Sequence, residues 1–326
     1  MIRRKFLKAS VLTGLTSGGL LSVLPKPGFS ATAKKDVVAR IGVCTDLHQD
    51  IIYDAPRRLQ AFINEMNQLK PDFIIQMGDF CTPKPENKII MDIWNQFAGI
   101  KHHVIGNHDT DGGFTHDQVI NFWNARDKYY SFDLNNYHFI ILNGNEKGSG
   151  YEGYARTISV KQRDWLETDI ANTNLPVIVF CHQPLDNDIG GIDQANWVRT
   201  IFDRANQQAG HIKVKLVVSG HHHLDWCNVY NGISYLQINS MSYQWMGDIP
   251  AHSHYSSEIE NGHPSVKYTA PYTDPIWAFF TIYSDGTIGV KGRKTTFVTP
   301  SPQEMGAPKF HLGYSDVAYI SDRVIK

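Results

Sequence analysis

The stretch VVARIGVCTDLH, residues 37–48, decides the fold class. Its first eight residues are mostly apolar or β-branched, which favours a buried strand, and the run ends in a polar turn that carries Asp46 and His48. Helical periodicity over residues 56–70 and a second short apolar run over residues 73–77 follow. This order predicts a β-α-β unit, in which parallel strands place functional side chains at their carboxyl ends.

The same alternation continues along the chain. Further strands are expected near residues 102–105, 137–142, 177–180 and 214–218, and further helices near residues 116–124 and 160–171. After Gly232 the pattern becomes hairpin-like, with segments 276–283 and 287–290 around a Ser-Asp-Gly turn, and we expect these to add a second sheet. Because no repeat or linker divides the sequence, residues 34–326 are predicted to form a single α/β domain.

Composition narrows the class of protein further. The 326 residues are 42% hydrophobic and 12% aromatic, which excludes a disordered, collagen-like or coiled-coil chain. The formal net charge is −1, and residues 1–33 hold five of the 31 basic residues and no acidic one, so 26 basic residues face 32 acidic ones in residues 34–326. This balance argues against binding to a nucleic-acid polymer and favours a small substrate.

Residues 1–33 are predicted to be an export signal. The basic run Arg-Arg-Lys-Phe-Leu-Lys at residues 3–8 is followed by an uncharged stretch over residues 10–24 and a small-residue run over residues 30–33. The pattern resembles a twin-arginine signal, which implies passage through the twin-arginine export machinery into the periplasm or out of the cell. The alternative is an uncleaved membrane anchor, but the apolar stretch is short and rich in Gly, Ser and Thr, so no stable anchor is expected.

Five polar motifs stand where the expected strands end. They are Asp46-Leu47-His48, Gly78-Asp79, Gly106-Asn107-His108-Asp109, Cys181-His182 and Gly220-His221-His222-His223. In extended backbone, residues two apart point the same way, so the paired ligands of the first and last motifs are expected to face one cavity. Oxygen and imidazole ligands without Cys-x-x-Cys pairs suit Mn, Fe or Zn in an open catalytic site.

Each motif taken alone has a structural explanation. Asp46 and His48 fit a surface turn, His182 fits a hydrogen-bonded core histidine, and residues 106–109 fit a helix cap. The order of all five motifs at successive strand ends favours a shared metal site.

This order of motifs resembles the calcineurin-like metallophosphoesterase superfamily, in the branch similar to bacterial cyclic-nucleotide phosphodiesterases. The helix around Gln162, Trp165 and Leu166 fits that branch. The resemblance implies a four-layered α/β/β/α sandwich that binds two divalent or mixed-valence transition-metal ions. It assigns one ion to Asp46, His48 and His223, the other to Asn107, His182 and His221, and the bridge between them to Asp79. It places His108 at the phosphate, with Asp109 behind it.

The expected function is that of an exported two-metal phosphoesterase acting on a small phosphodiester. Two cations would deliver a water to phosphorus as hydroxide, His108 would protonate the leaving oxygen, and Asp109 would fix the tautomer of His108. A phosphomonoesterase, a two-metal hydrolase of other bonds and a non-catalytic metal-dependent binding protein are the alternatives. Thr82 departs from the resemblance, because purple acid phosphatases have Tyr there and many relatives have a second acid.

Two features of the sequence leave their roles open. The aromatic residues between 243 and 277 either cover the metals and select the substrate or pack on the core; they are Tyr243, Trp245, Tyr255, Tyr268, Tyr272 and Trp277. Cys44, Cys81 and Cys181 each lie within two residues of a predicted ligand, so they are either small buried residues or partners in a disulfide.

Overall fold

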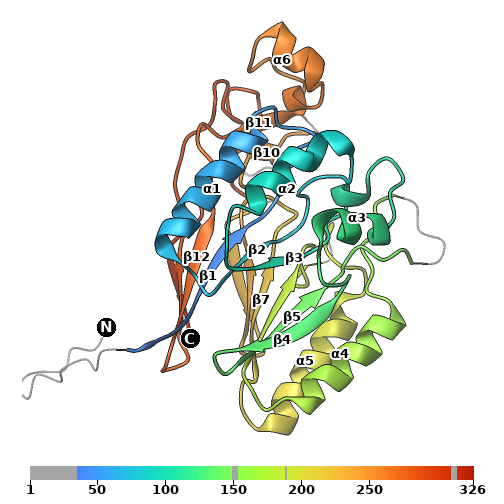
Figure 1. The fold of residues 1–326 in the computed structure, drawn as a ribbon, viewed down its shortest axis with the longest axis vertical. Coiled ribbons are helices and arrows are strands. Elements are labelled where there is room, and N and C mark those ends of the chain that lie inside the picture. Colours follow the sequence, from blue (N-terminus) through green and yellow to red (C-terminus); the bar gives the residue numbers. More distant parts are fainter. Residues whose placement is uncertain (1–34, 149–152, 188, 248, 310–313) are drawn as a thin grey trace, which may run out of the picture. The chain divides into compact units, whose positions relative to one another are not determined.

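The computed structural model describes residues 35–148, 153–187, 189–247, 249–309 and 314–326. Two six-stranded sheets form the centre of this unit, and helices cover their outer faces (Figure 1). The predicted signal at residues 1–33 lies outside the described residues. Within the described part of the chain, none of the helices has both the length and the apolarity needed to cross a bilayer.

The first sheet contains the strand that opens the sequence pattern. Its order is β14 (Arg323–Ile325), β13 (Ile288–Lys291), β12 (Ala278–Tyr283), β1 (Val37–Cys44), β2 (Phe73–Gln76) and β3 (Ile100–His103). β1, β2 and β3 are parallel, with Ile41 opposite Phe73 and Phe73 opposite Ile100. This arrangement confirms the predicted β-α-β unit.

The carboxyl-terminal hairpin was predicted to add a second sheet, and this expectation is wrong. β12 pairs antiparallel with β1, and β13 pairs with β12, so the hairpin extends the first sheet. The reason is that β1 has a free edge on the side away from β2, where the alternating apolar residues of β12 complete the core.

The second sheet is formed by the middle of the chain. Its order is β4 (Tyr130–Leu134), β5 (Tyr137–Leu142), β6 (Val177–Cys181), β7 (Val214–Ser219), β9 (Ile233–Gln237) and β8 (Trp226–Tyr230). β5, β6, β7 and β9 are parallel, and antiparallel strands close both edges. The nearly continuous apolar sequences of β5 and β6 are typical of strands buried on both faces.

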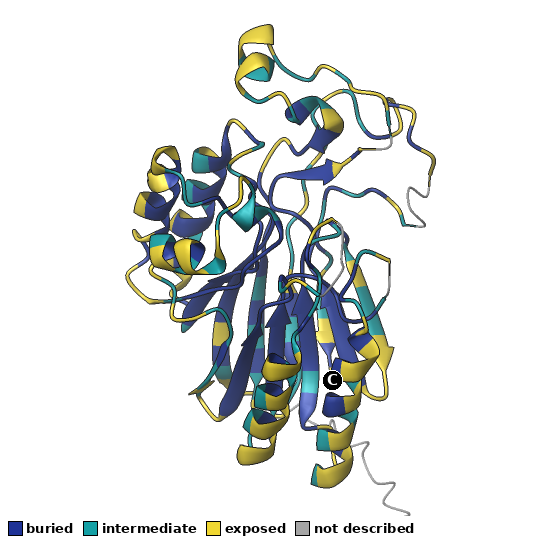
Figure 2. Cartoon of the chain, turned by 90° about the vertical axis from the view of Figure 1, so that its right-hand side faces the viewer, coloured by how far each residue is buried: buried dark blue, intermediate teal, exposed yellow. Residues whose placement is uncertain are grey.

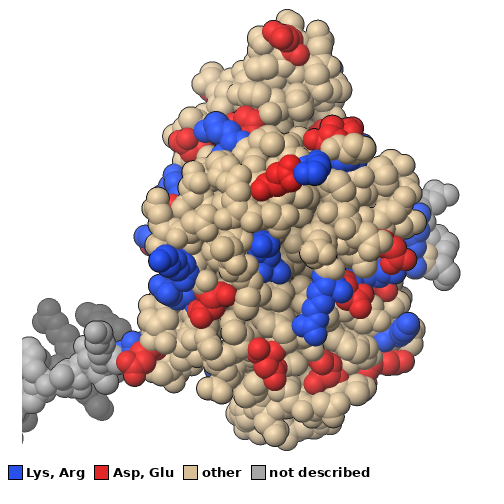
Figure 3. Space-filling view, in the orientation of Figure 1, with Lys and Arg blue, Asp and Glu red and all other residues tan. Residues whose placement is uncertain are grey.

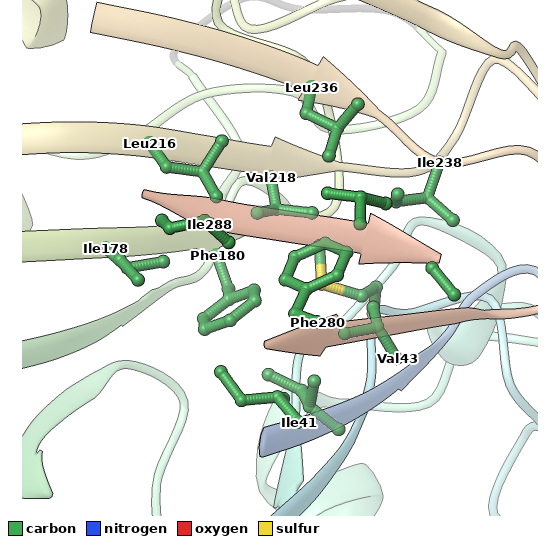
Figure 4. Packing of buried hydrophobic residues seen from close by; sticks show 14 of the residues in the cluster. Ile41, Val43, Ile178, Phe180, Leu216, Val218, Leu236, Ile238, Phe280 and Ile288 are labelled. Carbon is green, nitrogen blue, oxygen red and sulfur yellow. The ribbon is translucent and has the colours of Figure 1, made fainter. Parts of the chain in front are cut away.

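The main core lies between the two sheets. Figure 4 shows Ile41 and Val43 of β1 and Phe280 of β12 facing Ile178 and Phe180 of β6 and Val218 of β7. These side chains are almost completely buried. Removing this apolar area from water, at about 25 cal/mol per Å², is the main force that holds the sheets together.

Helices on both outer faces complete four layers, which confirms the predicted sandwich. On the first sheet these are α1 (Ala55–Leu69) and α2 (Lys88–Trp94), with α3 (His116–Trp123) beside them; on the second they are α4 (Val160–Asn172) and α5 (Ala195–Ala209). α1 starts with Pro56 in its first turn and buries Leu59, Phe62, Ile63 and Met66 at helical spacing. The helices are buried toward the sheets and exposed toward solvent (Figure 2).

A small module follows the last motif. It contains the two-stranded sheet of β10 (Tyr243–Trp245) and β11 (Thr269–Pro271), with α6 (Ser257–Gly262) between them in sequence. The short 3-10 turns of the described chain are η1 (Pro85–Asn87), η2 (His108–Thr110) and η3 (Val266–Tyr268). Figure 1 shows the module at the end of the molecule opposite the lower ends of α4 and α5.

Candidate metal centre

All five predicted motifs follow strand ends and meet in one place. Three of them follow the parallel strands β1, β2 and β3 of the first sheet, and two follow β6 and β7 of the second. The imidazole of His182, after β6, lies with Nε2 3.2 Å from Oδ2 of Asp79, after β2. The centre therefore lies where the carboxyl ends of both sheets come together.

The first group of ligands comes from the loops after β1 and β7. Nε2 of His223 lies 3.2 Å from Oδ1 of Asp46 and 3.2 Å from Nε2 of His48. These three residues are buried and place one ligand atom each within a span that one cation fills. They are the three residues that the sequence assigned to one ion.

Asp79 joins the first group to a second one. His182 and His221 form that second group with Asp79. Oδ2 of Asp79 lies 3.6 Å from Nε2 of His48 and 3.2 Å from Nε2 of His182, so one carboxylate oxygen reaches both groups. This is the position that a bridging ligand requires.

The unpaired atoms of the site fit metal ions. Oδ1 of Asp46, Oδ1 of Asn107 and Nε2 of His182 are buried and have no hydrogen-bond partner among the described residues. Nδ1 of His182 donates to the carbonyl of Met77 at 2.8 Å, so Nε2 is the nitrogen that faces Asp79 and would bind a cation in place of a proton. Because unpaired buried polar atoms are costly, this donor set is best explained by two cations.

The backbone conformation of the ligands differs from the extended one expected from the sequence. Asp46, His48, Asp79, His221 and His223 all have a positive φ, between 52° and 70°. Alternate residues of the first and last motifs still converge, but they do so because left-handed residues curl each loop. Such backbone costs on the order of 1 kcal/mol per residue and persists only where surrounding contacts enforce it.

Two motif glycines allow the loops to approach closely. A Cβ on Gly106 would lie 2.2 Å from Oδ1 of Asp79, and a Cβ on Gly220 would lie 2.5 Å from Oδ2 of Asp46. Both spaces are taken by a proposed ligand, so a larger residue would displace the ligand itself.

Acids and histidines at the centre stabilise each other's charges. Burial raises the pKa of Asp79, but His182, His108 and His48 outweigh it and hold that pKa well below its usual range. Burial likewise lowers the pKa of His182, while Asp79 and Asp46 raise it to about 9. The carboxylates are thus ionised and ready to bind cations.

His108 reaches the centre, but the carboxylate that it contacts is not the predicted one. Nδ1 of His108 lies 2.7 Å from Oδ2 of Asp111, and the hydroxyl of Tyr154 lies 3.2 Å from the same nitrogen. Asp109 was expected in this role. Its carboxylate instead accepts four backbone N–H bonds, from Asp79, Phe80, Cys81 and Gly106.

The position of Asp109 explains this correction. It is buried, and its two oxygens tie the loop after β2 to the loop after β3. Asp109 therefore shapes the backbone that presents Asp79, which leaves Asp111 as the partner of His108.

Thr82, the position that departs from the resemblance, donates its hydroxyl to Asp50 at 2.8 Å.

Three further positioning residues were missed in the sequence. Thr45 donates its hydroxyl to Oδ2 of Asp46, and Ser240 and Ser242 donate theirs to the carbonyls of Asp46 and Leu47. These contacts hold the left-handed turn after β1. Ser240 and Ser242 follow β9, the next parallel strand beside β7, and this position at a strand end is the signal that could have found them.

The aromatic segment divides between core and surface. Tyr272 and Trp277 are buried within hydrophobic clusters, so for these two the core-packing alternative holds. Tyr243 is buried with its ring 5.0 Å from that of His48, whereas Trp245 is 44% exposed.

All four cysteines are free thiols, and Cys44, Cys81 and Cys181 are buried, so no disulfide forms among them.

Known proteins match this chain in sequence and fold. The family model for calcineurin-like phosphoesterases matches residues 39–225, which include all seven predicted ligands. A 3',5'-cyclic-nucleotide phosphodiesterase from Nostoc sp. is 24% identical over 281 residues, which cover 80% of this chain and 94% of that protein.

Two solved structures are similar in fold. A dimetal phosphatase from Danio rerio has a TM-score of 0.58 at 15% identity, covering 82% of this chain and 100% of that chain. GAP50 of Plasmodium, described as the anchor in the inner membrane complex, has a TM-score of 0.51 at 15% identity, covering 82% and 86%. At this identity, the likeness shows a shared fold only.

Proposed function

Because this chain belongs to the calcineurin-like phosphoesterase family and is a metal-dependent phosphoester hydrolase, we propose that its substrate is a small phosphodiester. The observation that carries the proposal is the position of Asp79. Its Oδ2 reaches His48 of one ligand group and His182 of the other, so two cations would lie within reach of one phosphate.

Bound cations would activate a water and neutralise the phosphate oxygens. The residues of the chain supply the rest. Nδ1 of His108 is bonded to Asp111, so Nε2 is the atom left to reach the leaving oxygen. Asp109 and Gly106 hold the two loops that place Asp79 beside His108, whose backbone N–H donates to Oδ1 of Asp79 at 2.8 Å.

The charge of the site supports a diester rather than a monoester. A monoester brings roughly one more negative charge at neutral pH, so a site that prefers it benefits from Lys or Arg beyond the metals. The positive charges that most strongly lower the pKa of Asp79 come from histidines. The name of the Nostoc relative, a cyclic-nucleotide phosphodiesterase, points in the same direction.

The surface supports a small substrate. Lys and Arg are interspersed with Asp and Glu on the face shown in Figure 3, and neutral residues cover much of it. Binding of a nucleic-acid polymer relies on a continuous basic surface, which this face does not offer.

Side-by-side hydrolysis tests the substrate class. The purified protein is reconstituted with Mn²⁺, Zn²⁺ or iron and assayed with bis(4-nitrophenyl) phosphate and 4-nitrophenyl phosphate. We expect kcat/KM for the diester to equal or exceed that for the monoester, and Asp79→Asn to abolish both activities. Cleavage of the monoester alone would favour a phosphomonoesterase. Stoichiometric metal binding without hydrolysis of any ester would favour a binding protein.

We also propose that residues 1–33 direct export through the twin-arginine machinery and leave residues 34–326 as the mature domain. Support comes from the consecutive Arg3 and Arg4 and the weakly apolar stretch after them. Changing both arginines to Lys should retain the precursor in the cytoplasm, whereas Lys26→Arg should not. Unimpaired export of the double variant would overturn this proposal.

A further inference from the structure

Five aromatic rings form a row through the metal centre. The order is Tyr154, His108, His48, Tyr243 and Trp245, with successive ring centroids 4.7, 5.2, 5.0 and 6.4 Å apart. The two end residues are half-exposed, Tyr154 at 49% and Trp245 at 44%, while Tyr243 and His48 are buried. The row therefore has two accessible ends, Tyr154 and Trp245.

The Tyr154 end adjoins the group that would protonate a leaving oxygen. Tyr154 contacts His108 through its ring and through its hydroxyl, 3.2 Å from Nδ1. Beside it is a cavity of about 690 Å³, whose walls include Asn107, Asp111, Phe114 and Tyr154. A leaving group protonated by His108 must lie on this side of the phosphate.

The carboxylates around this cavity already have partners. Asp111 pairs with His108, Asp117 pairs with Lys128 at 2.7 Å, and Glu146 accepts bonds from Ser159 and Gln162. Because these three carboxylates are already paired and Lys147 also lines the wall, the cavity is not suited to a cationic group. Phe114 and Tyr154 give it unsaturated faces, which favour a flat ring.

The Trp245 end of the row adjoins His48 through Tyr243. Tyr243 and Trp245 are two residues apart on β10, so their side chains point to the same face of that strand. Tyr243 lies against His48 and His223, with ring centroids at 5.0 and 4.9 Å. Trp245 therefore continues the row from the first ligand group to the exposed surface.

We propose that a phosphodiester binds with a fixed orientation, its leaving alcohol against Tyr154 and its retained alcohol against Trp245. The leaving alcohol carries a flat face and no positive charge. The bond from phosphorus to this alcohol breaks, water supplies the hydroxyl that stays on phosphorus, and the leaving oxygen gains a proton. This orientation rests on the proposed diesterase function.

Two diesters that differ only in the retained half test the orientation. Methyl 4-nitrophenyl phosphate has one aromatic group, which leaves, and bis(4-nitrophenyl) phosphate also retains one. Tyr154→Ala should raise KM about fivefold for both substrates, because both lose the ring contact of the leaving group. Trp245→Ala should raise KM by a similar factor for the bis-aryl diester alone.

Two further variants separate contact from other effects. Tyr154→Phe keeps the ring but loses the hydroxyl near His108, so it should raise KM for both diesters less than Tyr154→Ala does. Tyr230→Ala removes an exposed aromatic ring at the opposite end of the second sheet and should change neither substrate's kinetics.

The remaining outcomes also decide the question. If Trp245→Ala affected both diesters and Tyr154→Ala only the bis-aryl one, the orientation would be reversed. If KM were unchanged in both alanine variants, neither ring would contact the substrate, although the diesterase function would still stand. If the unaltered enzyme cleaved neither diester, the proposed function would fail and the orientation with it.

Discussion

Asp111 holds the imidazole of His108, with Oδ2 2.7 Å from Nδ1. His108 begins the short turn η2 and Asp111 follows its end, so one turn of backbone brings the two residues together. Although burial lowers the pKa of His108, Asp79 and Asp111 raise it to about 9. Asp111 thus fixes both the direction and the charge of the ring that faces the substrate.

Removal of the Asp111 carboxylate should impair turnover through His108. We expect Asp111→Ala to lower kcat about tenfold for a diester with a poor leaving group, and His108→Ala to lower it about 10²–10⁴-fold. Both proteins should keep their metals, because neither residue belongs to a ligand group. Steady-state kinetics and metal analysis measure these effects.

A double variant distinguishes positioning from an independent role. If Asp111 acts only through His108, His108→Ala with Asp111→Ala should be no slower than His108→Ala alone. Asp117→Asn, a change of a nearby exposed acid that pairs with Lys128, should leave kcat unchanged. Additive losses in the double variant would contradict this assignment of Asp111.

Loss of the bridging carboxylate should empty both metal positions. Asp79→Asn should abolish activity and lower both occupancies, since Oδ2 of Asp79 contacts both groups. His182→Ala should chiefly empty one position, because His182 belongs to the second group only. Two full metal equivalents in both variants would refute the division into two groups.

A methyl group at Gly106 should damage the centre without contacting a metal. The Cβ of Gly106→Ala would lie 2.2 Å from Oδ1 of Asp79, so the bridging carboxylate must move. We expect activity to fall more than about a hundredfold and stability to fall by about 1–3 kcal/mol. Gly262→Ala is the matched control, because a Cβ there meets no atom within 4 Å. Equal activity of the two variants would show that Asp79 tolerates the shift.

His138 should make folding stability depend on pH at a site far from the metals. Its ring lies 2.6 Å from Asp133 and 2.8 Å from Asp169, linking β4, β5 and α4. Burial lowers the pKa of His138, but the bonds to Asp169 and Asp133 outweigh it and raise that pKa above its ordinary value.

A histidine whose pKa is higher in the folded state stabilises the protein. This stabilisation is complete at pH values below the pKa of the unfolded chain, about 6.5, and is lost as the pH rises through the pKa of the folded state. His138→Gln should therefore lower the free energy of unfolding by about 1 kcal/mol at pH 5.5 and by less at pH 9. The expected loss is small because Asp133, one of the two partners, is largely exposed. Urea unfolding at the two pH values measures this difference. A larger loss at pH 9 would contradict the assignment.

The ligands could be predicted because each stands directly after an apolar strand. Asp46, Asp79 and His182 needed only the rule that parallel strands end at a common edge. The left-handed backbone of the loops could not be predicted, since it depends on contacts such as Ser240 to the carbonyl of Asp46, 194 residues away in sequence. Asp109 was misassigned because the resemblance placed it behind His108, whereas its carboxylate accepts bonds from backbone N–H groups.

The sequence predicted the α/β class of the fold but not the order of the strands within the sheets. Local periodicity identified the strands of both sheets that carry the site, but it contains no information on which strand edges pair, so the hairpin of β12 and β13 was placed in the wrong sheet. α5 was missed, although Ala195, Val198, Ile201 and Phe202 recur at helical spacing and are buried. Tyr154 could not be predicted, because no pattern in the sequence links its loop to His108.

His48 and His223 meet across a separation of 175 residues, one from each sheet. The first metal position therefore does not exist until the two sheets have docked, and contacts so distant in sequence form late in folding. Metal capture must follow that step. Because selectivity among transition ions depends on geometry, ligand type and metal availability, we expect the ion supply at the moment of docking to influence which metal is bound. We therefore expect the metal content of the protein to depend on the compartment in which it folds.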